Sequence, residues 1–160
     1  MNLKDKLFQE TILVPLVARN REDAIQELLT HLKSLDILSE TTKLFSNIKE
    51  QESVSTSATG RGIAYPHSMS VELNELVCIL GKSIDGIEFN SPDGHLCHLI
   101  LLTLSPENDP LEHRKFISHF RNMVNNPSTR ASLFEATNSE DIMNIIYQWE
   151  ENEAQSDELE

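Results

Sequence analysis

The sequence is poor in basic residues and has no long apolar stretch. Thirteen Lys and Arg stand against 26 Asp and Glu, so the formal net charge is −13. Such an excess of negative charge argues against nucleic acid or an anionic membrane as a partner. No stretch has the length that a bilayer-spanning helix needs, and the first ten residues lack the apolar centre of a signal peptide. We therefore expect a cytoplasmic protein without direct membrane insertion.

Cysteine is also scarce. The two cysteines, Cys78 and Cys97, each lie inside an apolar run. This placement is typical of buried, reduced thiols and is consistent with the cytoplasm. A disulfide between them remains the alternative.

The length of the chain and its acidic end predict the domain organisation. A chain of 160 residues with 39% hydrophobic residues is the size of one globular domain. From Glu150 to Glu160 there are six acidic residues and no basic ones, a composition typical of a solvated tail. We expect one domain over residues 1–150 and an acidic, disordered tail over residues 151–160.

Helical and strand periodicities alternate along the chain. After a helical turn and an extended piece over residues 1–19, N-cap residues followed by apolar stripes predict the helices, and short apolar runs predict the strands. The pattern predicts an α/β protein whose mixed central β-sheet is flanked by helices on both faces. Helices are expected from Asn20 to about residue 35, from Ser39 to about Glu52, from an Asp109 cap to about Val124, from Asn126 to about Ala136 and from Ser139 to Trp149, and strands at Ile63–Tyr65, Leu76–Leu80, Ile84–Phe89 (short, at an edge) and Leu96–Leu104.

The stretch Thr59–Ser68 is the strongest candidate for a functional site. It holds two of the five glycines of the chain, and Pro66 fixes the backbone just before His67. No Gly-Lys-Ser/Thr follows, so the glycines do not indicate a nucleotide. We interpret His67 as a nucleophile that accepts a phosphoryl group, the alternative being a histidine that merely ends a strand. The expected donors to the phosphoryl oxygens are backbone N–H groups and the side chains of Ser57, Thr59, Arg61 and Ser68.

His113 is the second candidate. It falls in the first turn of the helix that Asp109 is expected to cap, where unpaired N–H groups and the helix dipole attract anions such as phosphate. A neutral imidazole there is able to donate a hydrogen bond to a phosphoryl oxygen or to orient a second ring. The alternative is an ordinary surface histidine.

The pattern of histidines and cysteines does not favour a metal site. His95, Cys97 and His98 cluster on a predicted strand, where alternate residues point to opposite faces. His98 would therefore point away from the other two, and the paired spacing of a zinc site is missing. We expect no metal.

The residues around His67 resemble a known family. Gly-Arg-Gly-Ile-Ala-Tyr-Pro-His resembles the Gly-x-Gly-[Ile/Val]-Ala-[Ile/Val]-Pro-His signature of the mannitol/fructose-type enzyme IIA domains of the bacterial phosphoenolpyruvate-dependent phosphotransferase system, which the nitrogen-regulatory IIA proteins share. Ile87–Gly94 is similar to that family's strand and turn, and Glu112-His113 is similar to its second histidine at a helix start. The resemblance runs from about Leu3 to Trp149.

The resemblance implies a phosphoryl carrier. His67 would accept the group from HPr or a relative and pass it to a IIB partner or keep it as a regulatory mark, in sugar transport or nitrogen regulation. It implies that His113 lies beside His67 and helps to hold the group. It also implies a mixed sheet flanked by helices, with no metal or organic cofactor, and we expect a monomer or a weak homodimer.

The sequence departs from the family pattern upstream of the glycines. The family has Arg-Glu and then a Ser/Thr-Gly pair, where this chain has Gln51-Glu52 and Ser57-Ala58, and Tyr65 replaces an aliphatic residue. The missing arginine removes a cation that would stabilise the phosphoryl group, and Arg61 is the candidate to replace it. A second hypothesis follows: a regulatory or binding module with the same fold whose phosphotransfer is weakened or lost.

Overall fold

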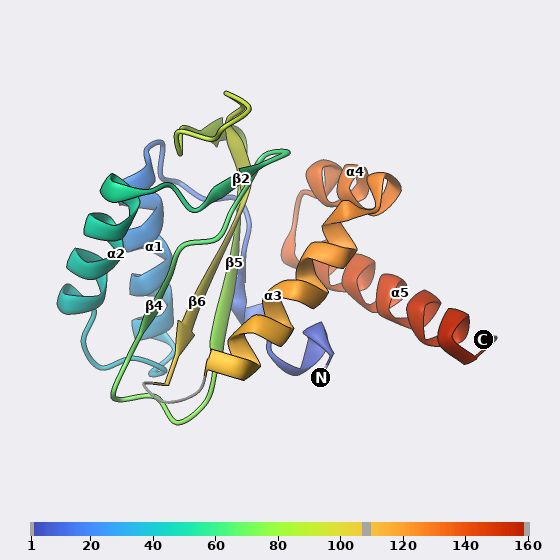
Figure 1. Ribbon diagram of the computed structural model, residues 1–160, viewed down its shortest axis with the longest axis horizontal. Coiled ribbons are helices and arrows are strands. Elements are labelled where there is room, and N and C mark those ends of the chain that lie inside the picture. Colours follow the sequence, from blue (N-terminus) through green and yellow to red (C-terminus); the bar gives the residue numbers. More distant parts are fainter. Residues whose placement is uncertain (1, 107–109, 159–160) are drawn as a thin grey trace.

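Strands from the whole first two thirds of the chain join in one mixed sheet with helices on both faces, as the sequence predicted (Figure 1). The computed structural model describes residues 2–106 and 110–158. Within these residues the strands follow the order β1-β5-β6-β3-β2, and β4 pairs with β6 as well. The strands are β1 (Ile12–Leu13), β2 (Ala58–Gly60), β3 (Ile63–Ala64), β4 (His67–Met69), β5 (Val77–Ile87) and β6 (Cys97–Ser105).

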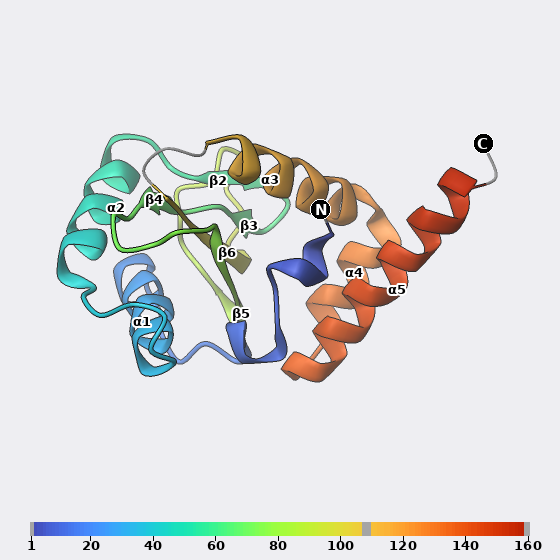
Figure 2. The same cartoon turned by 90° about the horizontal axis from the view of Figure 1, so that it is seen from below.

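The helices form two groups on opposite sides of the sheet, as Figure 2 shows from below. Helices α1 (Arg21–Ser34) and α2 (Thr42–Val54) cover one face. Helices α3 (Pro110–Asn125), α4 (Pro127–Glu135) and α5 (Ser139–Glu158) cover the other, with the short 3₁₀ turns η1 (Leu3–Asp5) and η2 (Gln9–Thr11) beside α5. In the part of the chain that the structure describes, no helix is both long and apolar enough to cross a membrane.

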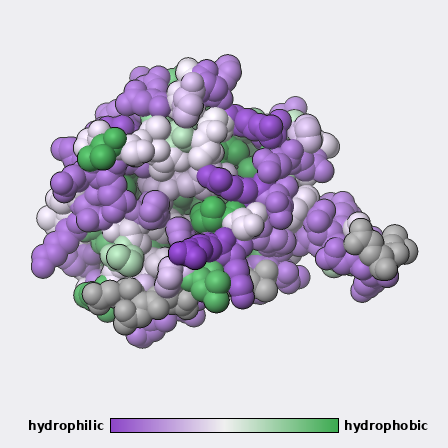
Figure 3. Space-filling view, viewed as in Figure 1, coloured by the Kyte–Doolittle hydropathy of each residue, from purple (hydrophilic) through white to green (hydrophobic). Residues whose placement is uncertain are grey.

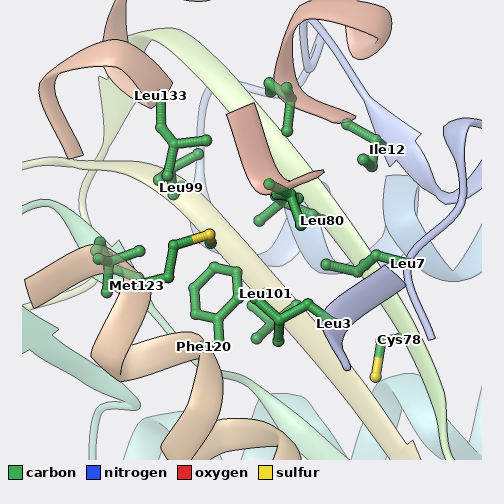
Figure 4. Packing of buried hydrophobic residues seen from close by; sticks show 14 of the residues in the cluster. Leu3, Leu7, Ile12, Cys78, Leu80, Leu99, Leu101, Phe120, Met123 and Leu133 are labelled. Carbon is green, nitrogen blue, oxygen red and sulfur yellow. The ribbon is translucent and has the colours of Figure 1, made fainter. Parts of the chain in front are cut away.

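The two faces of the sheet carry separate hydrophobic clusters. Leu99 and Leu101 of β6 point into the cluster under α3–α5, while Ile100 and Leu102 point into the cluster under α1 and α2. Figure 4 shows the first cluster, in which Phe120 of α3 packs against the strand leucines. The unbroken apolar run of β6 is therefore explained by burial on both faces.

The sheet has one long strand where the sequence predicted two. The prediction of a separate short strand at Ile84–Phe89 was wrong, because β5 continues from Val77 to Ile87. It pairs antiparallel with β6, with a shift of register between Lys82 and Ile87. Gly81 stays in this ladder, opposite Ile100. A Cβ at Gly81 would lie 2.9 Å from the side chain of Leu16, so the glycine allows close packing against the sheet and does not break the strand.

The predicted cap of the first helix is confirmed, and so is that of α4. The side-chain oxygen of Asn20 accepts the backbone N–H of Asp23 at the start of α1. Asn126 does the same for Thr129, with Pro127 in the first turn of α4. The expected cap of α3, Asp109, lies outside the described residues.

The predicted cap of α2 was wrong. Ser39 gives its backbone N–H and its hydroxyl to the carboxylate of Glu72, which holds it outside the helix. The helix begins at Thr42, and Glu40 accepts the backbone N–H groups of Thr41 and Thr42. A carboxylate next to the first turn also complements the helix dipole.

Helix α5 starts one residue earlier than the predicted cap at Ser139 would place it, and it extends further. Asn138 is the residue whose side chain accepts the N–H of Asp141, so Ser139 is already helical. Residues 151–158, for which a disordered tail was predicted, continue α5 as exposed helix. They contain no Gly or Pro and several good helix formers, so the helix has no reason to end at Trp149.

The two cysteines are free thiols on opposite sides of the sheet. Cys78 belongs to the cluster under α3–α5 and Cys97 to the cluster under α1 and α2. Burial raises the pKa of Cys97 to about 12 and raises that of Cys78 as well. Both are buried core residues that form no disulfide in this structure.

Candidate active site

The chain after the second glycine follows the edge of β6. Ile63 pairs with Leu99, and after a break at Tyr65-Pro66 the strand resumes with His67 opposite Thr103. The N–H of Thr103 donates to the carbonyl of Pro66 across this break. The proline thus keeps the chain on the sheet edge while it turns His67 outward.

His67 is exposed, and its ring is held by the backbone of its own segment. Nδ1 lies 3.3 Å from the carbonyl oxygen of Tyr65. A carbonyl oxygen can only accept, so Nδ1 carries the proton in this contact. In this tautomer the lone pair of Nε2 faces solvent, which is the form that a nucleophile requires.

His113 reaches the same place from the first turn of α3. The two imidazole rings lie 5.4 Å apart between centroids, tilted by 36°. Nε2 of His113 is 2.8 Å from the hydroxyl of Thr103, which fixes the ring. Burial, and then the charge of His67, lower the pKa of His113, so the ring is neutral at neutral pH. The juxtaposition implied by the family resemblance is present.

Two cavities meet at His67. One, of about 560 Å³, lies between α2, the end of β4 and the start of α3. The other, of about 610 Å³, lies along the last turns of α2 and the loop that follows it. The first is lined by Lys43, Leu44, Asn47, Gln51, His67, Ser68, Met69, Ser105, Pro106, Pro110 and His113, and the second by Asn47, Glu50, Gln51, Glu52, Val54, Ser55, Thr56, Ser57 and His67.

Asn47 joins α2 to the strand that carries His67. Its side-chain oxygen accepts the hydroxyl of Ser68 at 2.9 Å and the amide of Gln51 at 2.6 Å. Ser68 lines the first cavity, as expected for a site residue, but its hydroxyl proton is engaged by Asn47. Gln51, which stands where the family has arginine, lies at both cavities and brings no charge to either.

Ser57 lies on the other side of His67. Its Oγ is buried and has no hydrogen-bond partner within the described residues, although the residue lines the second cavity. Its backbone N–H donates to the buried carboxylate of Glu52. An unpartnered hydroxyl beside His67 is available as a donor to a group attached to that ring.

The structure does not bring Arg61 and Thr59 to His67. Ile63 and His67 pair with positions four residues apart along β6, about 13 Å, and Arg61 lies beyond Ile63 on the side away from His67. The Arg61 side chain donates to Asn125 at the end of α3. Thr59 lies on β2, and neither residue lines a cavity that contains His67. The expected replacement of the missing arginine by Arg61 is not compatible with this geometry.

The glycines serve the turn between β2 and β3. Gly60 and Gly62 have φ values of +102° and +78°, which residues with a side chain rarely adopt. The carboxylate of Asp93 accepts the N–H of Arg61 between them, and this bond, with those from Ser91 and His95, lowers the pKa of Asp93 to about 2. This turn lies at the far end of the segment from His67.

Sequence reasoning missed two residues of α2. Lys43 and Asn47 line the first cavity together with Gln51. The three positions are four residues apart, so they share one face of the helix. The departure at Gln51 was the available signal, since other residues on the same face lie next to it.

The histidines around Cys97 do not form a metal site. In the described ranges no group of three or more His, Cys, Asp or Glu is placed to hold a metal ion. Nδ1 of His98 donates to the carbonyl of Ser83, and its ring lies beside Phe134, on the face opposite Cys97.

A fold of this kind with two histidines facing each other at the end of its sheet defines a class of phosphoryl-transfer domain. The family described as "Phosphoenolpyruvate-dependent sugar phosphotransferase system, EIIA 2" matches residues 6–149. The chain therefore belongs to this family. It is an EIIA component of the phosphotransferase system, which is a phosphoryl carrier.

Two relatives are a sugar-specific component and a nitrogen regulatory protein. The chain is 27% identical over 148 residues to the fructose-specific EIIABC component of Bacillus subtilis, with 92% of this chain and 23% of that protein covered. It is 25% identical over 146 residues to a nitrogen regulatory protein of Bradyrhizobium diazoefficiens, with 91% of this chain and 95% of that protein covered. The chain thus spans about a quarter of the first relative and nearly all of the second.

Solved structures share the fold. The nitrogen regulatory protein IIA-Ntr of Neisseria meningitidis has a TM-score of 0.81 at 22% identity, covering 90% of this chain and 98% of that one. IIA mannitol of Escherichia coli has a TM-score of 0.73 at 20% identity, covering 88% and 99%. The complex of E. coli enzyme IIA mannitol with phosphorylated IIB mannitol also matches, at a TM-score of 0.72 and 18% identity, covering 89% and 98%.

Proposed function

We propose that Nε2 of His67 accepts a phosphoryl group from the phosphohistidine of an HPr-like carrier in the cytoplasm. His67 then passes the group to a IIB partner or keeps it as a regulatory mark. The single observation that carries this proposal is the contact of Nδ1 with the carbonyl of Tyr65, which leaves the Nε2 lone pair free on an exposed ring.

The transfer needs no acid or base from this chain. The lone pair of His67 Nε2 forms the new P–N bond as the bond between phosphorus and the donor nitrogen breaks. The electron pair of the broken bond stays with the donor imidazole, and Nδ1 of His67 keeps its proton against Tyr65. Catalysis of such a step consists of positioning and of donors around the three phosphoryl oxygens.

Two side chains next to His67 suit that task. The ring of His113 is neutral because burial lowers its pKa, and its centroid lies 5.4 Å from that of His67, within reach of a group bound to that ring. The unpartnered hydroxyl of Ser57 lies on the other side of the ring. Thr59 and Arg61 have no part in this proposal.

Apolar side chains beside the site suit a protein partner. Met69, Val71 and Leu111 are exposed near the end of β4 and the start of α3. Figure 3 shows green apolar patches that interrupt the hydrophilic surface on this face of the molecule. HPr-like and IIB proteins are the expected occupants, and an E. coli mannitol IIA protein has been solved with its phosphorylated IIB. That the protein is a monomer or weak homodimer remains a prediction.

One observation favours a second candidate function. Gln51 is bound to Asn47 and supplies no cation where the family has arginine. A regulatory or binding module that has lost phosphotransfer would tolerate this change.

Labelling separates the two functions. The protein is incubated with phosphoenolpyruvate, enzyme I and HPr, and acid-labile phosphate is measured on the native chain and on His67→Ala. We expect stoichiometric label on the native chain and none on the variant. An unlabelled native chain would favour the regulatory module, and label retained in His67→Ala would contradict the site.

A further inference from the structure

The site needs a cation that neither Gln51 nor Arg61 supplies. A phosphoryl group carries close to two negative charges, and charge-assisted hydrogen bonds to its oxygens are the strong ones. Lys43 lines the cavity of about 560 Å³ together with His67 and His113. Among the described residues that line either cavity at His67, it is the only Lys or Arg.

Lys43 reaches the site because of the way α2 is seated. Helix α2 packs beside β4, the strand that begins with His67. Asn47, one turn after Lys43 on the same helix face, is fastened to Ser68 by a hydrogen bond of 2.9 Å. This bond fixes the register of α2 against the strand and keeps the Lys43 side chain at the cavity.

The charges around His67 favour an anion on the side of the first cavity. The second cavity is lined by the carboxylates of Glu50 and Glu52, which repel an anion. The first cavity has Lys43 on one wall and Pro110, the first residue of α3, on another. The positive end of the α3 dipole adds to the attraction of Lys43.

From these observations we propose that Lys43 binds the phosphoryl group on His67 from the side of the first cavity. Lys43 thus takes the role that the family gives to an arginine at the position of Gln51. The two positions are eight residues apart, about 12 Å along the helix, so the cation comes from a different direction. This inference rests on the proposed function of His67.

Two phosphoryl donors test the assignment. Phosphoramidate is a small donor that needs no docking surface: its P–N bond breaks as the bond to His67 Nε2 forms, and ammonia leaves. The second donor is HPr phosphorylated by enzyme I. The label on His67 is followed over time for the native chain, Lys43→Gln and Lys49→Gln. Lys49 is the matched control, since it is exposed on the same helix and lines neither cavity.

We expect Lys43→Gln to slow labelling by about tenfold with both donors, the effect of losing one charge-assisted hydrogen bond. Lys49→Gln should match the native chain. Gln51→Arg, added to Lys43→Gln, should restore most of the rate. Because Lys43 is exposed, the unfolding midpoint of Lys43→Gln should equal that of the native chain.

The outcomes are distinguishable. If Lys43→Gln is labelled at the native rate by both donors, the assignment is overturned. A slower rate seen only with HPr would overturn it as well, because Lys43 would then contribute to the docking of HPr and not to binding of the phosphoryl group. If phosphoramidate labels His67 and HPr does not, the carrier role fails while the Lys43 assignment is still decided by the small donor. If neither donor labels His67, both proposals fail.

Discussion

Tyr65 supports His67 through its backbone and is fastened by its side chain. The carbonyl that accepts the Nδ1 proton of His67 would be present whatever residue stood there. The tyrosine ring is buried edge-on against Phe120, 6.0 Å between centroids, and the guanidinium of Arg121 lies 5.0 Å from its centroid. The aromatic replacement of the usual aliphatic residue therefore ties the His67 segment to α3 without altering the tautomer of His67.

His113 makes the stability of the fold depend on pH. Burial lowers its pKa in the folded state below the usual value of 6.5, so the unfolded chain binds more protons as the pH falls below that value. The free energy of unfolding should decrease as the pH falls from the unfolded pKa towards the folded one. In His113→Gln this component is absent, so the decrease should be shallower.

Urea unfolding at about pH 7.5 and about pH 5.5, on either side of the unfolded pKa, measures this difference. His95→Gln serves as the control, because His95 is exposed in the loop before β6. Equal pH dependence in His113→Gln and the native chain would contradict the prediction.

Among the secondary-structure elements, α2 contributes most to the site after the His67 segment. Its apolar positions and approximate extent follow from the sequence. Its start does not, because Ser39 is drawn out of the helix by Glu72, which lies 33 residues further along the chain. The polar face with Lys43 and Asn47 looks like ordinary solvated surface until Ser68 is placed opposite it.

Lys82 ties β5 to the end of α4. Its side chain is 4% exposed, and its ammonium group donates to the carbonyls of Phe134 and Ala136. Lys82→Met should lower the free energy of unfolding by about 2–3 kcal/mol, because two helix-end carbonyls lose a charged donor while remaining buried. Urea denaturation measures the loss of stability. Amide hydrogen exchange, compared between Lys82→Met and the native chain, should increase most in α4.

Lys115→Met is the control for this prediction, since Lys115 is exposed on α3. A Lys82→Met variant as stable as the control would mean that the burial of the lysine costs as much as its two hydrogen bonds contribute.

At the scale of the molecule, a buried carboxylate joins the two ends of the chain. Glu150 of α5 accepts the backbone N–H groups of Leu3 and Lys4, and it lies 3.1 Å from Nε2 of His119. Beyond it, α5 extends away from the body of the molecule (Figures 1 and 2). The buried part of α5 thus reaches to Glu150, and the exposed residues after it make no contribution to the core. The domain boundary at residue 150 stays a prediction.

Removal of residues 153–160 should leave the fold intact. The described part of this segment is exposed helix, so the free energy of unfolding should change by less than about 0.5 kcal/mol. Trp149→Ala, which empties a site 6% exposed, should cost about 3 kcal/mol and serves as the comparison. Thermal and urea unfolding measure both. A truncated chain destabilised as much as Trp149→Ala would show that the acidic end is part of the folded unit.

The sequence alone determined the fold class, most of the elements and the two histidines. These follow from local chemistry: apolar periodicity, the caps at Asn20 and Asn126, Pro66 before His67, and a histidine at the start of a helix. Their physical causes lie within a few residues of the chain, so they can be seen without a structure.

Only the tertiary structure decided which polar groups meet at His67. It brought Lys43 and Asn47 to the site from α2 and left Arg61 at the far end of the strand segment, bound to Asn125. Contacts between α2 and β4 depend on how both helix groups pack on the sheet, and no local pattern encodes them. For the same reason β5 was predicted as two strands, since the packing of Leu16 against Gly81 is visible only in three dimensions.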